Sequence, residues 1–317
     1  MMSPVALFLP LSTPPQRSNA HQWRRRRICL IIQALKSGQR GEDDYHSTLK
    51  ALNSRSRIVP RKSLGQHYML NSSINEQLSG VAGVAEGDVV LEIGPGTGSL
   101  TNVLINAGAT VVAVEKVLQE DITRCHFRSY VSSLLETVDT RGVVKYAKVV
   151  SNLPFNISTA VVKQLLPMGD LFSDVIILLQ DETALRLTKF QLHSSDYRPI
   201  NLFVNFYSDA EYICKVERTN FFPQPNVDAA VVKFKLKQKS EYPQVTSANS
   251  FFSMVNSAFS GKRKMLRKSL QHICMAQKIE DALRTVGLQA TARPQELTLE
   301  DFVRLHNLIC TSNPMKE

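Results

Sequence analysis

Apolar and polar residues follow one another along this chain in blocks that predict an α/β fold. Continuous runs of apolar, largely β-branched residues predict buried strands at 89–93, 109–115, 147–150, 174–180, 202–207 and 230–236. Apolar residues at helical spacing predict helices at 74–84, 129–137 and 161–166, and then at 251–259, 279–286 and 299–308. The order predicts a sheet domain, a polar linker at 237–243 and a small helical domain.

The strand at 89–93 runs into a glycine-rich turn, and a helix is predicted directly after it. Gly94, Gly96 and Gly98 form the turn, and helical spacing begins at Ser99. Glycine tolerates positive φ and close approach of a ligand, and the free N–H groups of a helix start bind polar ligand atoms. Dinucleotide sites have Gly-x-Gly-x-x-Gly, but Ser99 occupies the third glycine position here. The turn favours a nucleoside-like cofactor, and a βα turn without a ligand is the alternative.

The next strand ends in Glu115, roughly twenty residues past the turn, where an acid commonly accepts hydrogen bonds from ribose hydroxyls. A solvated carboxylate is the alternative. The pattern then conflicts with the fold, because 117–122 has the character of another strand and only Lys116 separates it from Glu115. Parallel strands need a crossover of about a dozen residues or more. Either this is one long strand, or a crossover helix is missing near 116–117.

Two rigid segments carry groups that suit a nucleobase. Asn152, Leu153, Pro154 and Phe155 follow a strand, and a side-chain amide oxygen with a backbone carbonyl can accept hydrogen bonds from an exocyclic amine. The neighbouring aromatic ring can stack on the base that carries this amine. The second segment, 220–228, holds two prolines and two adjacent phenylalanines. We expect its Phe222 to be a hydrophobic anchor of the loop.

The net charge of +10 is mostly a property of the N-terminal segment. The chain has 38 Lys and Arg against 28 Asp and Glu, and residues 1–41 hold seven of the cations and no acid. This Ser-, Pro- and Arg-rich composition is typical of a disordered transit peptide, for the plastid in preference to the mitochondrion. A basic arm that contacts RNA is the alternative, and 42–57 is predicted to be a linker.

One cluster beyond this segment can contact phosphates. Five cations stand within seven residues without an acid, namely Lys262, Arg263, Lys264, Arg267 and Lys268. A solvated face is the alternative. The five cysteines are scattered and form no metal-binding pair, so we expect no metal site. No apolar run is long enough to cross a membrane.

Together, five runs resemble the ribosomal RNA small-subunit adenine dimethyltransferase family, most closely its plastid members. They stand in family order at 62–67, 91–101, 152–155, 221–228 and 261–267. The resemblance implies a Rossmann-like class I methyltransferase domain with a mainly parallel sheet over 58–238, and a C-terminal helical RNA-binding domain over 244–317. It also implies S-adenosylmethionine as cofactor and small-subunit ribosomal RNA, or the pre-small ribosomal subunit, as partner. We expect a monomer that does not bind membranes.

The resemblance also implies residue roles. Gln66 and His67 would cover the cofactor, Gly94 and Gly96 would approach its amino-acid portion, Glu115 would hold its ribose, and Asp121 with Ile122 would hold its adenine. Asn152 and Leu153 would accept hydrogen bonds from the N6 amine of the target adenosine, and Phe155 and Phe221 would stand on either side of the base. Asn152 would also border the cofactor. Lys262, Arg263, Lys264, Arg267 and Lys268 would bind RNA. The expected product carries two methyl groups on each of two adjacent adenosines near the RNA 3′ end.

The chain departs from the family at 115–117, where family members carry a helix with its flanking loops. The missing helix would form one wall of the adenine pocket. We therefore expect that Glu115 and Asp121 do not both reach their family positions and that cofactor affinity is lowered.

Two other functions fit the same fold. One is a non-catalytic RNA-binding or ribosome-assembly factor, which would retain RNA without methyl transfer. The other is an organelle transcription factor, which would prefer promoter DNA. A nicotinamide oxidoreductase is disfavoured by the glycine spacing and by the segment 152–155.

Overall fold

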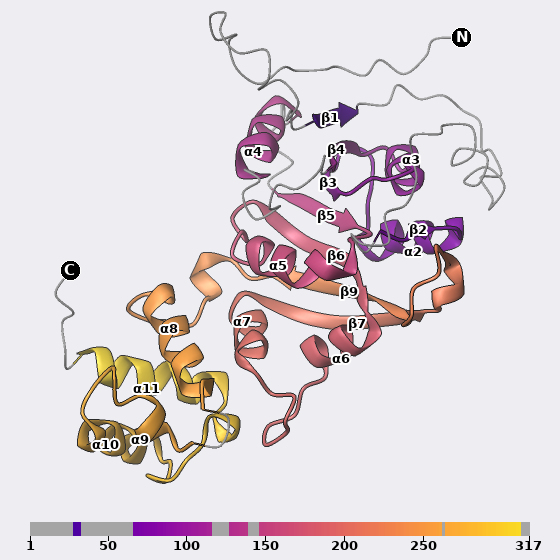
Figure 1. The fold of residues 1–317 in the computed structure, drawn as a ribbon. Helices are drawn as coiled ribbons and strands as arrows, with labels where there is room; N and C mark the ends of the chain where they lie inside the picture. Colours follow the sequence, from indigo (N-terminus) through magenta and orange to yellow (C-terminus); the bar gives the residue numbers. More distant parts are fainter. Residues whose placement is uncertain (1–27, 33–65, 116–126, 139–145, 262–263, 312–317) are drawn as a thin grey trace, which may run out of the picture. The chain divides into compact units, whose positions relative to one another are not determined.

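The computed structural model describes residues 28–32, 66–115, 127–138, 146–261 and 264–311 (Figure 1). The chain divides into two compact units, Met1–Ala184 with Glu211–Leu236 and Leu185–Ala210 with Lys237–Glu317. Residues 185–210, which we expected in the sheet domain, thus belong to the second unit. None of the helices in the described part of the chain has the length and apolar character needed to span a membrane.

A seven-stranded sheet forms the centre of the first unit, in the order β1-β4-β3-β5-β6-β9-β7. β3 pairs in parallel with β4 and β5, and β5 with β6, whereas β1 and β9 run antiparallel to their partners β4 and β6. A separate ladder pairs β2 with β8. The strands are Ile28–Ile32 (β1), Tyr68–Met69 (β2), Val89–Ile93 (β3), Thr110–Glu115 (β4), Ala147–Ser151 (β5), Phe172–Gln180 (β6), Ser208–Val216 (β7), Phe221–Phe222 (β8) and Ala229–Leu236 (β9).

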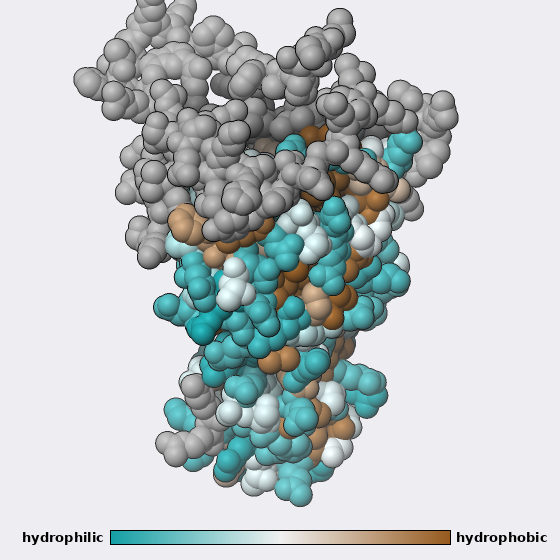
Figure 2. All heavy atoms as spheres, turned by 90° about the vertical axis from the view of Figure 1, so that its right-hand side faces the viewer, coloured by the Kyte–Doolittle hydropathy of each residue, from teal (hydrophilic) through white to brown (hydrophobic). Residues whose placement is uncertain are grey.

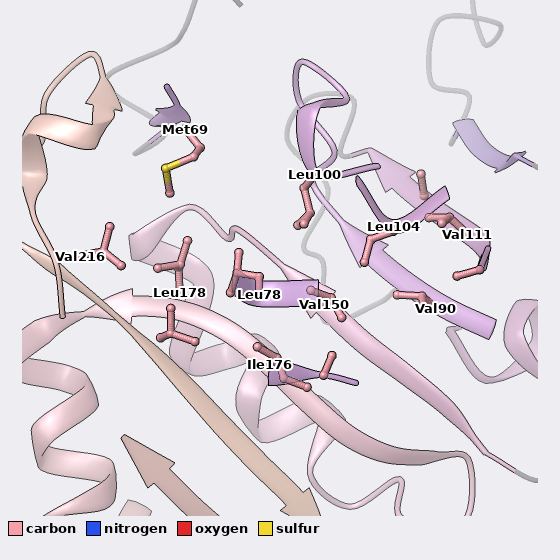
Figure 3. Packing of buried hydrophobic residues seen from close by; sticks show 14 of the residues in the cluster. Met69, Leu78, Val90, Leu100, Leu104, Val111, Val150, Ile176, Leu178 and Val216 are labelled. Atoms are coloured by element: carbon pink, nitrogen blue, oxygen red, sulfur yellow. The ribbon is translucent and has the colours of Figure 1, made fainter. Parts of the chain in front are cut away.

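Helices of the first unit pack their apolar sides on this sheet. Leu78 of α2 and Leu100 with Leu104 of α3 meet Val90 and Ile176 of the sheet in one buried cluster (Figure 3). The spacing of four between Leu100 and Leu104 places both on one side of α3. The helices are Ser72–Val81 (α2), Ser99–Asn106 (α3), Phe127–Val138 (α4), Phe155–Leu165 (α5) and Asp181–Thr188 (α6), and a 3₁₀ turn covers Arg218–Asn220. The boundary between the two units falls within α6, after Ala184.

The predicted strands at 89–93, 109–115, 147–150, 174–180 and 230–236 are confirmed within a few residues at their ends, as are the helices at 74–84 and 129–137. The helix predicted at 161–166 is part of a longer one that already begins at Phe155. α4 stands between parallel strands β4 and β5, where a crossover helix is required. The predicted strand at 117–122 lies outside the described residues. The hypothesis of a missing helix near 116–117 therefore stays a prediction.

The position beside β4 at the sheet edge is taken by β1. Its register pairs Ile28 with Glu115 and Ile32 with Val111, antiparallel to β4. We expected residues 1–41 to be disordered, and for these five residues that expectation is wrong. β-branched and apolar residues in a row suit a strand, and β4 offers them an edge.

The predicted strand at 202–207 is also wrong, because these residues belong to a helix, Pro199–Tyr207 (α7). Leu202, Val204 and Phe206 are all buried, so the run shows no amphipathic period that separates helix from strand. Local signals decide the structure. Pro199 opens the helix with its fixed φ, and the Asn201 side chain accepts the Arg198 N–H at 2.9 Å as an N-terminal cap.

The second unit is helical, and the predicted helices at 251–259, 279–286 and 299–308 are confirmed. Its helices besides α7 are Ala248–Phe259 (α8), Leu266–Ser269 (α9), Ala276–Val286 (α10) and Leu299–Thr311 (α11), with 3₁₀ turns at Lys239–Glu241 and Pro294–Glu296. Aromatic rings fill its core, including Phe206 against Phe251 at 5.4 Å and Phe259 against Phe302 at 6.0 Å between ring centroids. In Figure 2 hydrophilic side chains cover most of the coloured surface of one face of the molecule, with apolar residues in smaller areas between them.

Candidate active site

The connections of the sheet define where a ligand can bind. From β3 the chain passes through α3 to β4 on one side, whereas β5 lies on the other side of β3. In open α/β sheets ligands bind outside the carboxyl ends of the strands at such a switch point. The two segments that leave these strand ends are the glycine loop, residues 94–98, and the segment 152–155.

The glycine loop has the backbone that its sequence requires. φ is +74° at Gly94, +54° at Gly96 and +81° at Gly98, all in the left-handed region that other residues rarely adopt. Gly94 donates its N–H to the carbonyl of Val114 at 2.8 Å, which joins the loop to β4. Gly98 is the N-cap of α3 and provides no side-chain cap, so this helix start can receive a polar ligand.

Tyr68 lies directly against this loop. A Cβ atom added to Gly96 would lie 2.9 Å from Cε1 of the Tyr68 ring, so a larger residue at 96 would collide with it. Tyr68 belongs to the stretch that precedes α2, and we did not assign it a role from the sequence. No local sequence pattern predicts this contact, because it joins residues that are 28 positions apart in the chain.

On the other side of the switch point, Asn152 is oriented by a hydrogen bond. Its Nδ2 donates to the backbone carbonyl of His67 at 3.3 Å. An amide has one donor end and one acceptor end, so Oδ1 is the end that can accept from a ligand amine. Leu153 has a buried side chain, and Pro154 precedes the helix α5 that begins with Phe155.

His67 links Asn152 to the segment 220–228. Its Nδ1 lies 2.6 Å from the carbonyl oxygen of Pro223, and because a carbonyl only accepts, Nδ1 carries the proton. The His67 ring also lies 5.6 Å from the ring of Phe155. Gln66 precedes His67 and is half-buried. The structure therefore brings Asn152, His67 and Phe155 together as expected for one site.

Of the two adjacent phenylalanines in the segment 220–228, the buried one is not the one that we expected from the sequence. Phe221 is 2 % exposed and meets Phe155 edge-on, with 6.3 Å between centroids and 70° between planes. The resemblance implied that these two rings stand on either side of the target base, whereas here they contact each other edge to face. Phe222 is 43 % exposed, so the expectation that it anchors the loop is wrong, and Phe221 is the anchor. The cause is strand alternation, which turns neighbouring side chains to opposite faces.

Ion pairing holds the far end of this loop. Asp228 accepts the Arg218 N–H at 3.0 Å and pairs with the Lys215 ammonium at 2.9 Å. The hydrogen bond from Lys215 holds the pKa of the Asp228 carboxyl below its usual value, with a smaller contribution from the Arg218 N–H.

Two buried polar contacts near the strand ends were not predicted. Thr101 donates its hydroxyl to the carboxylate of Glu92 at 2.5 Å, and Glu92 is 1 % exposed. Ser151, fully buried at the end of β5, accepts the Ile93 N–H at 2.8 Å. Backbone pairing of β3 with β5 ends at Leu91, so the Ser151 hydroxyl joins the two strand ends beyond it.

The remaining predicted site residues are placed only in part. The side chain of Glu115 and all of Asp121 and Ile122 lie outside the described residues, as do Lys262 and Arg263. Lys264 and Lys268 are exposed in the second unit. Arg267 donates to Glu280 at 2.8 Å, so its charge also ties α9 to α10.

Fold and site together define a class I methyltransferase, and comparisons identify its family. The model of the family "Ribosomal RNA adenine dimethylase" matches residues 59–310. Over 292 residues the chain is 63 % identical to a chloroplastic ribosomal RNA small subunit methyltransferase of Arabidopsis thaliana, covering 86 % of this chain and 85 % of the relative. It is 36 % identical over 268 residues to ribosomal RNA small subunit methyltransferase A of Protochlamydia amoebophila, covering 80 % of this chain and 93 % of that relative.

A solved dimethyladenosine transferase from Plasmodium falciparum shares the fold, with a TM-score of 0.56 at 21 % identity, over 75 % of this chain and 96 % of that one. The chain therefore belongs to the ribosomal RNA adenine dimethylase family. Its expected fold class is confirmed. It is an rRNA adenine dimethyltransferase by family, with S-adenosylmethionine as methyl donor.

The described part of the site fits this cofactor. The positive-φ glycine loop and the uncapped start of α3 suit close approach of its charged amino-acid portion.

Proposed function

We propose that this chain methylates the N6 amines of two adjacent adenosines near the 3′ end of plastid small-subunit ribosomal RNA. The observation that supports this most is the position of the segment 152–155 beside the glycine loop, where Cδ of Pro154 lies 4.0 Å from a Cβ atom added to Gly94. The acceptor end of the Asn152 amide is available there to a ligand. The family and the chloroplastic relative support the substrate and the compartment.

Gly94 and Gly96 hold the amino-acid portion of the cofactor, and Gln66 with His67 covers it. Glu115 is assigned to the ribose and Asp121 with Ile122 to the adenine. S-adenosylmethionine supplies, when bound, a methyl group on a positively charged sulfur.

Asn152 and Leu153 position the amine that receives this methyl group. Oδ1 of Asn152 and the carbonyl oxygen of Leu153 accept hydrogen bonds from N6 and fix the direction of its lone pair. Bound S-adenosylmethionine would supply the methyl group, and N6 would lose its proton only after accepting it, so no residue of the site has to act as a base beforehand. Positioning and electrostatics supply most of the rate. The carbonyl acceptors tolerate N6 after its first methylation, which permits a second.

Phe155 provides the stacking surface for the target base, which must leave its helix to reach the amine acceptors. Phe221 supports Phe155 from the core side. The cations of 262–268 contact RNA phosphates, and in this group Lys264 and Lys268 are exposed.

We further propose that residues 1–41 direct the chain to the plastid, that 42–57 form a linker, and that the protein acts as a monomer. The absence of acids in 1–41 and the chloroplastic relative support the targeting. Gel filtration with light scattering measures the molar mass in solution and so tests whether the protein is a monomer.

Two measurements test the proposed function. Titration calorimetry of the folded chain with S-adenosylmethionine should give a Kd on the order of micromolar. No detectable binding would mean that the missing helix near 116–117 has removed a necessary wall of the pocket. Methylation of small subunits that lack the modification should yield N6,N6-dimethyladenosine, detected by nucleoside mass spectrometry. RNA binding without methyl transfer would favour the non-catalytic factor, and absence of both contradicts the proposal.

A further inference from the structure

The small ladder of β2 and β8 has one core face and one outer face. Tyr68 pairs with Phe222, and Met69 with Phe221. Residues directly opposite one another share a face of the ladder. Met69 and Phe221 are 5 % and 2 % exposed and belong to the buried cluster, whereas Phe222 is 43 % exposed. Tyr68 and Phe222 therefore make an aromatic outer face.

This outer face borders the glycine loop. The Tyr68 ring lies against Gly96, where an added Cβ would come within 2.9 Å of it. The core face of the same ladder carries Phe221, which contacts Phe155. The exposed Phe222 ring thus stands next to the site on a different side from the buried rings.

The segment that carries Phe222 is held on both sides of the ring. Pro223, the next residue, accepts from His67 at 2.6 Å, and the Asn220 carbonyl accepts the Leu70 N–H at 2.8 Å. The Asn220 side chain accepts from Asn71 at 3.0 Å. A ring held in this way loses little backbone freedom when it binds a partner.

We propose that Phe222 stacks on the nucleobase next to the target adenosine. The inference rests on the proposed function. When a base leaves the stack, its neighbour in the strand loses a stacking partner, and an exposed ring beside the site can replace it. Proteins bind unstacked RNA bases on aromatic side chains in this way, largely independent of sequence. The partner of this face is therefore a single-stranded purine or pyrimidine of the RNA.

The test compares Phe222→Ala with Phe222→Tyr, which keeps the ring. Val227→Ala is the matched control, since Val227 is 45 % exposed in the same loop and has no ring. RNA affinity is measured by fluorescence anisotropy with a small-subunit RNA fragment. A 2-aminopurine next to the target position reports stacking directly.

We expect Phe222→Ala to raise the Kd for RNA about ten-fold and to remove the 2-aminopurine signal. Phe222→Tyr should restore both, Val227→Ala should change neither, and the Kd for S-adenosylmethionine should stay constant in all three. Unchanged RNA affinity in Phe222→Ala, an equal loss in Val227→Ala, or a change in cofactor affinity would overturn the proposal.

The outcome is separable from that of the proposed function. If the unaltered chain binds RNA but transfers no methyl group, the proposed function fails, yet the RNA affinities still decide whether Phe222 stacks. If the unaltered chain methylates RNA and Phe222→Ala does so with the same KM, only the stacking proposal fails.

Discussion

The two sides of the switch point are built differently. On the β5 side, side chains hold the functional residues through contacts over long sequence distances: Asn152 to His67, His67 to Pro223, and Ser151 to Ile93. On the β4 side, Glu115 ends a strand whose outer neighbour is β1, a five-residue strand from the N-terminal segment. The half of the site that we propose to bind the amine is thus fixed by the core of the first unit. The half that we propose to bind the ribose lies at the edge strand pair of β4 and β1.

The largest effect should come from Asn152, the centre of the β5 side. Asn152→Ala removes the side-chain acceptor for N6, and we expect kcat for methyl transfer to fall about 100-fold or more, as for the loss of one oriented polar group in other enzymes. Single-turnover assays with labelled cofactor measure it. Asn156→Ala, an exposed asparagine in the first turn of α5, is the control. Equal rates for the two variants would contradict the role of Asn152.

The next effect concerns the buried carboxyl group under the glycine loop. Thr101→Val removes the hydroxyl that donates to Glu92 and should lower the free energy of unfolding by about 2 kcal/mol. Urea denaturation measures this. Thr101→Ser keeps the hydroxyl and should lose much less unfolding free energy. Similar losses of unfolding free energy in both variants would point to packing as the cause.

A smaller effect is expected where the two sides meet. Ser151→Ala leaves the buried Ile93 N–H without its side-chain acceptor and should cost about 1–2 kcal/mol of unfolding free energy. Methyl transfer should slow as well, because Ile93 precedes the glycine loop and Ser151 precedes Asn152. A stable variant with full activity would show that this bridge does not set the spacing of the two loops.

The smallest effect on global stability should come from the β4 side. Deleting residues 1–33 removes β1, and we expect a loss of about 1 kcal/mol, because cross-strand pairs of an edge strand contribute little once their ordering entropy is counted. Hydrogen exchange should accelerate at amides of β4 and remain unchanged in β5. Unchanged exchange in β4 would mean that β1 contributes nothing to this edge in solution.

Most strands and helices could be predicted because their apolar runs are long and bounded by turn residues. The glycine loop was evident because three glycines within five positions directly follow a strand. α7 escaped prediction because burial on several sides erased its period. Its helix is set by Pro199 and Asn201, which are signals of one residue each.

The site was predictable in its motifs but not in its geometry. Asn152, His67 and Phe155 were placed in one site from the sequence, whereas the Ser151 bridge and the Tyr68 contact join distant segments without any local signature. The inversion of Phe221 and Phe222 had a further cause. β8 is two residues long, so the sequence contains no alternation from which to decide which ring is buried.

The division of the chain into units has a consequence for synthesis and for exchange of parts. The segment Leu185–Ala210, with α7, joins the C-terminal unit before the chain returns to complete the sheet with β7 and β9. During synthesis, α7 is therefore made well before α8 and α11, the helices against which it packs. A cut near residue 240 would also yield a C-terminal fragment without one of its own helices. Because the helical unit consists of two separate chain segments, recombination cannot transfer it as one continuous stretch of sequence.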